Sequence, residues 1–326
     1  MPRRPRVALV ALFFLTLASL VFALLSGAVA ITPYEWLEIL QGQPTLAAEV
    51  VWELRLPRAL AGFACGALLA FAGTLMQALL RNPLADPYIL GVSGGASIGA
   101  LASILLGLGG LALDVFAFGG ALAALLLVFG LAHGDGSWTQ TRLLLTGVMV
   151  AAGCGALVTL MLAIAPEARL RGMLFWLMGD LAQTLSPFPP LIFLGVALLL
   201  ALPFTRELNL LGRGAESAQT LGVNVRFLRR LVYFLAALAT AAAVTSAGAI
   251  GFIGLVVPHL TRLAIGNDQR LLLPAATLLG GTLLMAADTL ARTLIAPEQL
   301  PVGVLTALLG VPLFLFLLSR GKGRAP

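Results

Sequence analysis

Ten apolar segments, each close to the ~20 residues that a helix needs to cross ~30 Å of hydrocarbon, constrain this chain more than any other feature. Of its 326 residues, 60% are hydrophobic and 10% are charged, whereas about a quarter are charged in soluble proteins. The sequence therefore predicts an all-α, polytopic membrane protein with ten transmembrane helices in a single domain, residues 1–326. The predicted spans are residues 7–30, 58–80, 89–111, 115–132, 142–165, 188–204, 227–247, 250–266, 271–291 and 302–319.

The first apolar segment admits two interpretations. Its end, Ala28-Val29-Ala30, resembles a signal-peptide cleavage site. The apolar stretch nevertheless exceeds the ~7–15 residues of a signal-peptide core, which favours an uncleaved transmembrane helix. Residues 31–57 are less apolar and carry four glutamates, so we expect this segment outside the membrane.

The basic residues predict an orientation. With the N-terminus in the cytoplasm, fifteen of the twenty Lys and Arg residues fall in cytoplasmic segments and five fall outside, as the positive-inside rule requires. Both termini are then cytoplasmic, and the expected location is the bacterial cytoplasmic (inner) membrane. The five outer cations are Arg55, Arg58, Arg169, Arg171 and Arg292.

Residues 205–230 form a polar loop between two spans and carry five arginines and two glutamates. Within the loop, residues 209–212 are predicted to form a short turn or helix, and residues 215–221 a short helix that Gly222 ends. The polar side chains of this second helix are expected to be exposed, whereas Ala215, Ala218 and Leu221 are expected to pack. Such helices offer a binding site for a partner. The alternative is an amphipathic helix that rests on the inner leaflet.

Several function classes find no support in the residues. The net charge of +6 comes from arginines scattered over short loops, which membrane orientation explains, so no nucleic-acid partner is expected. The chain has no GxxxxGK[ST] phosphate loop, and its single lysine, Lys322, lies in the C-terminal tail. Cys65 and Cys154 lie inside apolar segments and do not form a metal motif. We therefore expect no cofactor, no metal and no enzymatic activity, and any ATP hydrolysis must occur in a partner.

Two polar constellations leave alternatives open. Ser93, within a GxSxG pattern, and His133 could form the dyad of an intramembrane serine protease of the rhomboid type. The pattern arises easily by chance in a glycine-rich chain, and His133 lies at the end of its span, so this function is the weaker hypothesis. Asp288 and Arg292 are spaced i, i+4 on one helix, as in a local salt bridge or a proton relay.

Five long motifs, in order along almost the whole chain after the first span, resemble the permease family of ABC importers for ferric siderophores, haem and vitamin B12. They begin at Arg55 (RLPR), Gly73 (GTLMQALLRNPLADP), Leu90 (LGVSGGAS), Gly248 (GAIGFIGLVVPH) and Leu300 (LPVGVLTA). The resemblance implies a type II importer architecture. It also implies a homodimer that moves a bulky metal chelate through the lipid membrane with two cytoplasmic ATPase subunits and an extracytoplasmic substrate-binding protein.

The resemblance also assigns candidate sites. Gln140 and Thr141 match the positions of a cytoplasmic gate, although a solvated turn would have the same composition. Arg55, Arg58 and Arg292 are candidates for docking the binding protein, with anchoring at lipid headgroups as the alternative. The predicted ATPase-coupling residues are Gly212, Arg213, Gly214, Ala215, Glu216, Ser217, Ala218, Gln219, Thr220, Leu221 and Gly222.

Overall fold

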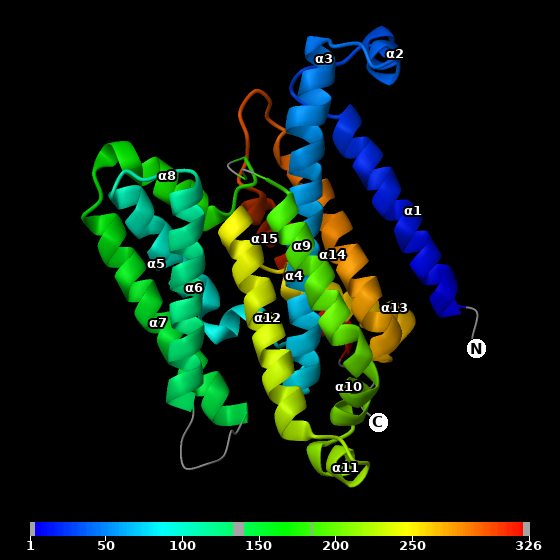
Figure 1. Ribbon diagram of the computed structural model, residues 1–326, viewed down its shortest axis with the longest axis vertical. Coiled ribbons are helices and arrows are strands. Elements are labelled where there is room, and N and C mark those ends of the chain that lie inside the picture. Colours follow the sequence, from blue (N-terminus) through cyan, green and yellow to red (C-terminus); the bar gives the residue numbers. More distant parts are fainter. Residues whose placement is uncertain (1–3, 133–139, 183, 185, 322–326) are drawn as a thin grey trace.

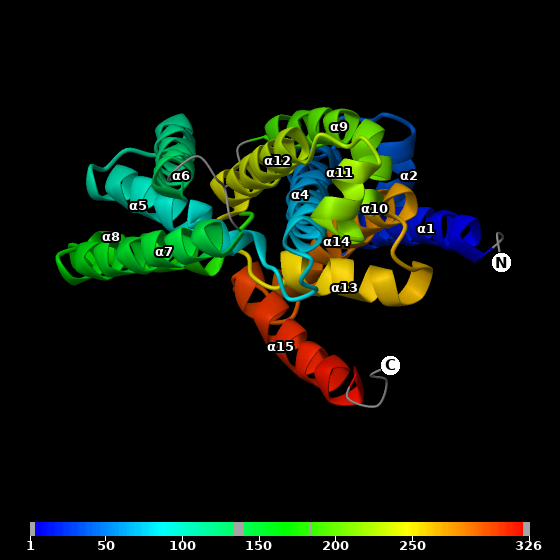
Figure 2. The same cartoon turned by 90° about the horizontal axis from the view of Figure 1, so that it is seen from below.

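The computed structural model describes residues 4–132, 140–182, 184 and 186–321, and this part of the chain is helical throughout its regular structure. Helices α5 to α8 stand to one side, while most of the other long helices are arranged around α4 (Figures 1 and 2). The elements are α1 (Arg4–Leu25), α2 (Pro33–Leu40), α3 (Leu46–Glu49), η1 (Val50–Arg55), α4 (Leu56–Leu80), η2 (Pro87–Leu90), α5 (Val92–Leu105), α6 (Leu111–Ala132), α7 (Gln140–Ala163), α8 (Glu167–Met178), α9 (Phe188–Ala201), η3 (Leu202–Phe204), α10 (Thr205–Gly212), α11 (Ala215–Thr220), α12 (Val225–Ala247), α13 (Ile253–Ile265), α14 (Gln269–Ala291) and α15 (Val302–Gly321).

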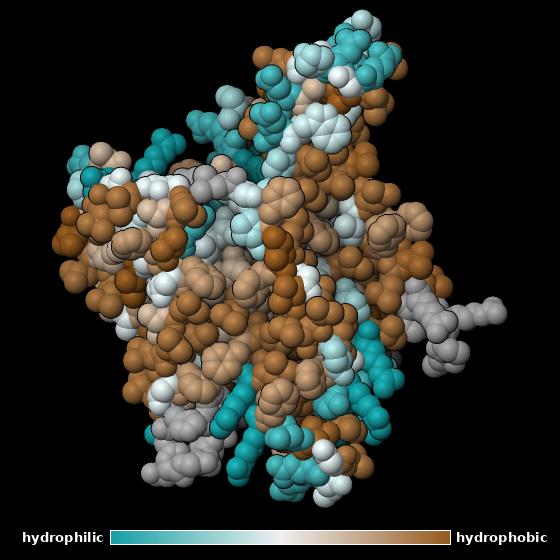
Figure 3. All heavy atoms as spheres, viewed as in Figure 1, coloured by the Kyte–Doolittle hydropathy of each residue, from teal (hydrophilic) through white to brown (hydrophobic). Residues whose placement is uncertain are grey.

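The predicted spans are confirmed. Seven helical stretches are long and apolar enough to cross a membrane, and α5, α13 and α15 are shorter apolar helices. Together they occupy the ten predicted segments. The second stretch begins earlier than predicted, because α3, η1 and α4 are continuous from Leu46 to Leu80. Apolar residues cover the middle of the face in Figure 3, and polar residues gather at its top and bottom, as expected for a protein that spans a bilayer.

Helix α4 is the centre of the bundle. Every residue from Ala64 to Leu79 is buried, and the helix packs against α9, α12, α13 and α14. Its glycines allow close backbone approach: a Cβ atom at Gly73 would overlap the backbone of Gly254 in α13. Small residues at such crossings supply the packing that holds helices together where lipid removes the hydrophobic driving force between them.

The chain is not helical between α12 and α13, and this break lies beside the middle of α4. Gly254, just after the break, packs against the Leu69 carbonyl oxygen and the Pro87 ring. At membrane depth, backbone groups outside a helix need partners within the protein. The Tyr88 hydroxyl supplies them: it donates to the Ile250 carbonyl oxygen at 2.7 Å and accepts from the Ile250 N–H at 3.0 Å.

Replacing this hydroxyl is expected to destabilise the protein. Tyr88→Phe leaves the Ile250 N–H and carbonyl without their partner, which costs about 1–3 kcal/mol of folding free energy for a buried group. Thermal unfolding in detergent measures the effect. Tyr34→Phe is the matched control, because Tyr34 is 70% exposed on α2. Equal stability of the two variants would show that the Tyr88 hydroxyl does not support the break.

Candidate functional site

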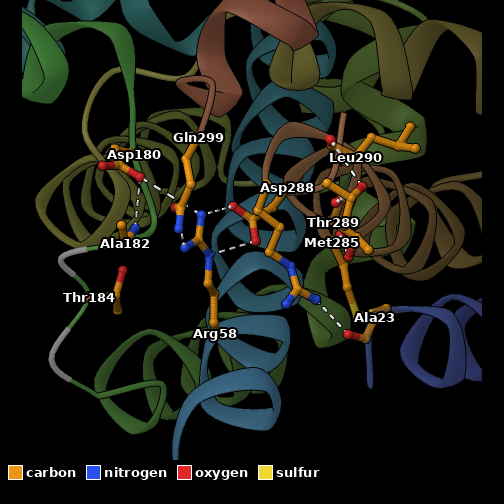
Figure 4. A network of polar contacts seen from close by, with 12 residues as sticks. Ala23, Arg58, Asp180, Ala182, Thr184, Met285, Asp288, Thr289, Leu290 and Gln299 are labelled. Atoms are coloured by element: carbon orange, nitrogen blue, oxygen red, sulfur yellow. Dashed lines mark hydrogen bonds and ion pairs between the residues drawn. The ribbon is translucent and has the colours of Figure 1, made fainter. Parts of the chain in front are cut away.

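A network of polar side chains lies at the end of the bundle where α4 begins, and joins α4 to α14 and to the loops after α8 and α14 (Figure 4). Arg58, in the first turn of α4, binds Asp288 of α14 through two hydrogen bonds, Nε to Oδ2 at 2.9 Å and Nη2 to Oδ1 at 2.8 Å. Asp180, after α8, lies 4.0 Å from Nη2, and Gln299 accepts from Nη1 at 2.9 Å. A bidentate arginine–carboxylate pair fixes the relative orientation of the helices that carry it.

The network corrects the interpretation of Asp288 and Arg292 as a local salt bridge. The Asp288 side chain is 3% exposed and its two oxygens accept from Arg58. Arg292 instead donates to the Ala23 carbonyl oxygen in α1. The i, i+4 spacing was compatible with pairing along the helix, but α4 brings a guanidinium closer to the carboxylate than the next turn of α14 does.

Arg55 and Arg292 both bind the C-terminal end of α1. Arg55 donates to the carbonyl oxygens of Leu24 at 2.7 Å, of Leu25 at 3.3 Å and of Val29. The last carbonyls of a helix have no partner within it and carry partial negative charge, so two guanidinium groups stabilise them. Arg55 is 3% exposed and Arg292 9% exposed. Both predicted docking cations therefore have an internal role that sequence reasoning missed.

Helices α10 and α11 lie at the opposite end of the bundle (Figure 1). Leu208 and Leu211 of α10 and Ala218 of α11 are each at most 1% exposed, and all three belong to the main hydrophobic core of the bundle. Glu216, Ser217, Gln219 and Thr220 are exposed, as predicted. The pair of helices is thus packed rigidly against the spans on one side and presents polar groups on the other.

Both ends of α11 are formed as the sequence predicts. Gly214 and Gly222 adopt φ angles of 134° and 82°, which residues with a Cβ rarely accept. The Val223 N–H donates to the Ala218 carbonyl and the Gly222 N–H to the Gln219 carbonyl, the two hydrogen bonds of a Schellman motif. These bonds close the helix at a defined position and leave little freedom at its end.

Leu221 does not pack within the bundle. Leu221 follows the last turn of α11 and is 65% exposed. It lines a cavity of about 390 Å³ between α10, α12 and the turn after α11, together with Arg206, Glu207 and Phe227.

The candidate gate lies at the start of α7, and Ser93 of the candidate dyad lies on α5. Gln140 is the first residue of α7, and Thr141 after it is exposed. Ser93 is half-buried in the first turn of α5. His133 lies outside the described residues.

The comparisons with known proteins agree with this arrangement. The model of the FecCD transport family matches residues 15–320. The chain belongs to the FecCD transport family. Among curated FecCD-like relatives, the vitamin B12 import system permease protein of Klebsiella pneumoniae is 40% identical, over 99% of this chain and 96% of that protein. The hemin transport system permease protein of Yersinia pestis is 46% identical, over 83% of this chain and 84% of that protein. The relatives are transport permeases and give the protease hypothesis no support.

Solved structures show the same FecCD fold. A metal-chelate type ABC transporter in an inward-facing conformation matches with a TM-score of 0.84 and 32% identity, covering 97% of this chain and 99% of that chain. The PsaBC complex of Streptococcus pneumoniae with Fab matches with a TM-score of 0.56 and 18% identity, covering 86% and 94%. The second match supports the fold alone.

Sequence reasoning missed helix α8 and two partners of Arg58. Helix α8 was treated as a connection between spans, although it forms a helix of its own. Asp180 and Gln299 lie in the loops after α8 and α14, where polar residues are ordinary. The sequence did offer one signal for Asp180, which directly follows Gly179. Gly179 ends α8 with a φ angle of 78°.

Proposed function

We propose that this FecCD protein is the permease subunit of an ATP-driven ABC importer for a bulky metal chelate, such as a ferric siderophore, haem or cobalamin. It would act as a homodimer with two separate ATPase subunits and an extracytoplasmic binding protein. The observation that carries the proposal is the family match over residues 15–320, joined to a packed short helix in a basic loop at one end of the spans. The vitamin B12 and hemin permeases among the relatives supply two of these substrate classes.

The proposed orientation places α11 and both termini in the cytoplasm. The positive-inside distribution of arginines supports it, and α11 and the start of α1 lie in the lower half of Figure 1. The network around Arg58 then faces the extracytoplasmic side. In this arrangement the coupling residues Gly212 to Gly222 meet the ATPase, which hydrolyses ATP on behalf of the permease.

Reconstitution tests the function directly. The permease is placed in proteoliposomes with its ATPase inside and its binding protein outside, and uptake of cobalamin, haem and a ferric siderophore is measured separately. We expect ATP-dependent uptake of one class of chelate that requires all three proteins. Uptake without the ATPase, or the absence of uptake for every chelate in a complex that hydrolyses ATP, would contradict the proposal.

Docking of the binding protein is proposed at the outer network. The Arg58 side chain is 15% exposed, whereas Arg55 is 3% exposed and Arg292 is 9% exposed. The Arg58 guanidinium has five N–H donors. Three of them donate to Asp288 and Gln299. A carboxylate of the binding protein could bind the accessible edge of Arg58, while Arg55 and Arg292 hold the end of α1 beside it.

The cytoplasmic gate is proposed at Gln140 and Thr141, where α7 begins. Short polar side chains that face the axis of a dimer can close a pathway by mutual contact. Cysteines at position 140 or 141 are expected to cross-link between subunits at least several-fold faster in one nucleotide state than in another. The natural Cys154, a buried residue of the same helix, is replaced by alanine in the background. Equal cross-linking with and without nucleotide would contradict the gate.

A further inference from the structure

A cationic surface lies beside α11, which we call the coupling helix. Arg81, Arg213 and Arg262 line one cavity of about 780 Å³ at the α11 end of the bundle. Figure 2 looks onto this end, where α10, α13 and α14 surround the end of α4. We call the cavity with these three guanidinium groups the arginine basin.

The three arginines come from different elements. Arg81 ends α4, Arg213 ends α10, and Arg262 lies in the last turn of α13. A helix C-terminus favours a nearby cation, which accounts for each arginine alone. It does not account for three guanidinium groups converging on one cavity, because like charges repel one another.

The basin lacks balancing negative charge. Asp268 is the only carboxylate among its lining residues. One of its oxygens already accepts from the Asn209 side chain at 2.7 Å and from the Arg270 N–H at 3.1 Å, as the N-cap of α14. In the described part of the chain, no ion pair joins Arg81, Arg213 or Arg262 to an acidic residue. The basin therefore fits a ligand that carries negative charge.

The arginines indicate the kind of ligand. Gln77 and Gln269 also line the cavity, but their side-chain oxygens are buried and out of reach of a ligand there. The three guanidinium groups are therefore the groups that a ligand would bind. A guanidinium binds a carboxylate through two parallel hydrogen bonds, and an acidic polypeptide segment supplies such carboxylates.

The surroundings favour a protein over a lipid. The remaining lining is mostly polar, with Asn82, Asn209 and Asn267 at the cavity, so acyl chains would find little apolar surface there. The basin also shares Gly212 and Arg213 with the segment that leads into α11. A partner that binds α11 can therefore also contact the basin.

We infer that the arginine basin is a second docking site for the ATPase subunit, and that it binds an acidic segment of that subunit. This inference rests on the proposed function. The coupling helix connects the ATPase to α10 and α12, whereas the basin connects it to α4 and α13. Two contacts on separate helices let one ATPase movement change the angle between those helices.

Charge reversal tests the basin. The permease is held in nanodiscs of zwitterionic lipid, and its affinity for the purified ATPase is measured at several salt concentrations. Arg81→Glu combined with Arg262→Glu is expected to weaken binding at least about tenfold and to reduce its salt dependence. Arg226→Glu combined with Arg230→Glu makes the same change of net charge on exposed residues outside the basin, and is expected to change the affinity less than about threefold.

The neutral pair Arg81→Gln with Arg262→Gln is a milder variant that tests whether charge reversal only misfolds the permease. It should weaken ATPase binding less than charge reversal does and more than the control pair does. Unchanged ATPase affinity in both basin variants would overturn the inference. A thermal stabilisation by phosphatidylglycerol that the basin variants lose, with ATPase affinity unchanged, would show a lipid site instead. Failure of the unaltered permease to bind the ATPase would contradict the proposed function itself. That outcome is distinct from a loss of the basin's role alone.

Discussion

A permease that carries Ala218→Glu and Gly222→Pro is expected to lose at least about nine-tenths of its ATP-dependent uptake while its spans remain folded. Ala218 is fully buried in the core, and burying a carboxylate without a partner costs several kcal/mol. Proline at position 222 cannot adopt a φ angle of 82° and has no N–H for the Gln219 carbonyl. Helix α11 should therefore leave its position on α10 and α12. The segment would then be flexible, and the movement of the ATPase would not be transmitted to the spans.

The measurements are transport per ATP hydrolysed, binding of the ATPase and thermal unfolding of the permease. Gly42→Pro is a matched control at the other end of the molecule. Gly42 has a φ angle of 75°, and its N–H donates to the Ile39 carbonyl, as that of Gly222 does to Gln219. The control should leave coupling intact. Normal transport per ATP and normal complex stability in the double variant would place the coupling site elsewhere.

Removing the charge of Asp288 is expected to lower the stability of the protein strongly. Asp288→Asn leaves Arg58 without its bidentate partner, with Asp180 at 4.0 Å as the remaining carboxylate. Breaking a buried pair from one side costs about 3 kcal/mol or more, because the other charge stays buried. Thermal unfolding in detergent should show a large drop in the midpoint for this variant.

Neutralising both partners separates stability from docking. Arg58→Gln combined with Asp288→Asn removes the two charges together, so most of the lost stability should return. If Arg58 binds a carboxylate of the binding protein, this double variant folds but binds that protein at least about tenfold more weakly. Unchanged affinity would assign Arg58 a structural role only. A double variant as unstable as Asp288→Asn would contradict the account of the pair.

The sequence by itself determined the number and positions of the spans. The length of an apolar run and the residues at its ends are local properties, so ten segments could be read without knowing how they pack. The same holds for α11, since Gly214 and Gly222 mark its ends through backbone conformations that glycine accepts most readily. The arginine distribution likewise predicts an orientation, which stays a prediction.

Only the tertiary structure decided which charges meet. Asp288 binds Arg58, 230 positions away in the sequence, although Arg292 stands one turn along its own helix. Arg81, Arg213 and Arg262 converge on one basin although nothing in their spacing relates them. Leu221 is exposed because the turn after α11 directs it away from the core. Such contacts depend on the rotation and depth of each helix against its neighbours, which packing over the whole bundle sets and local sequence does not.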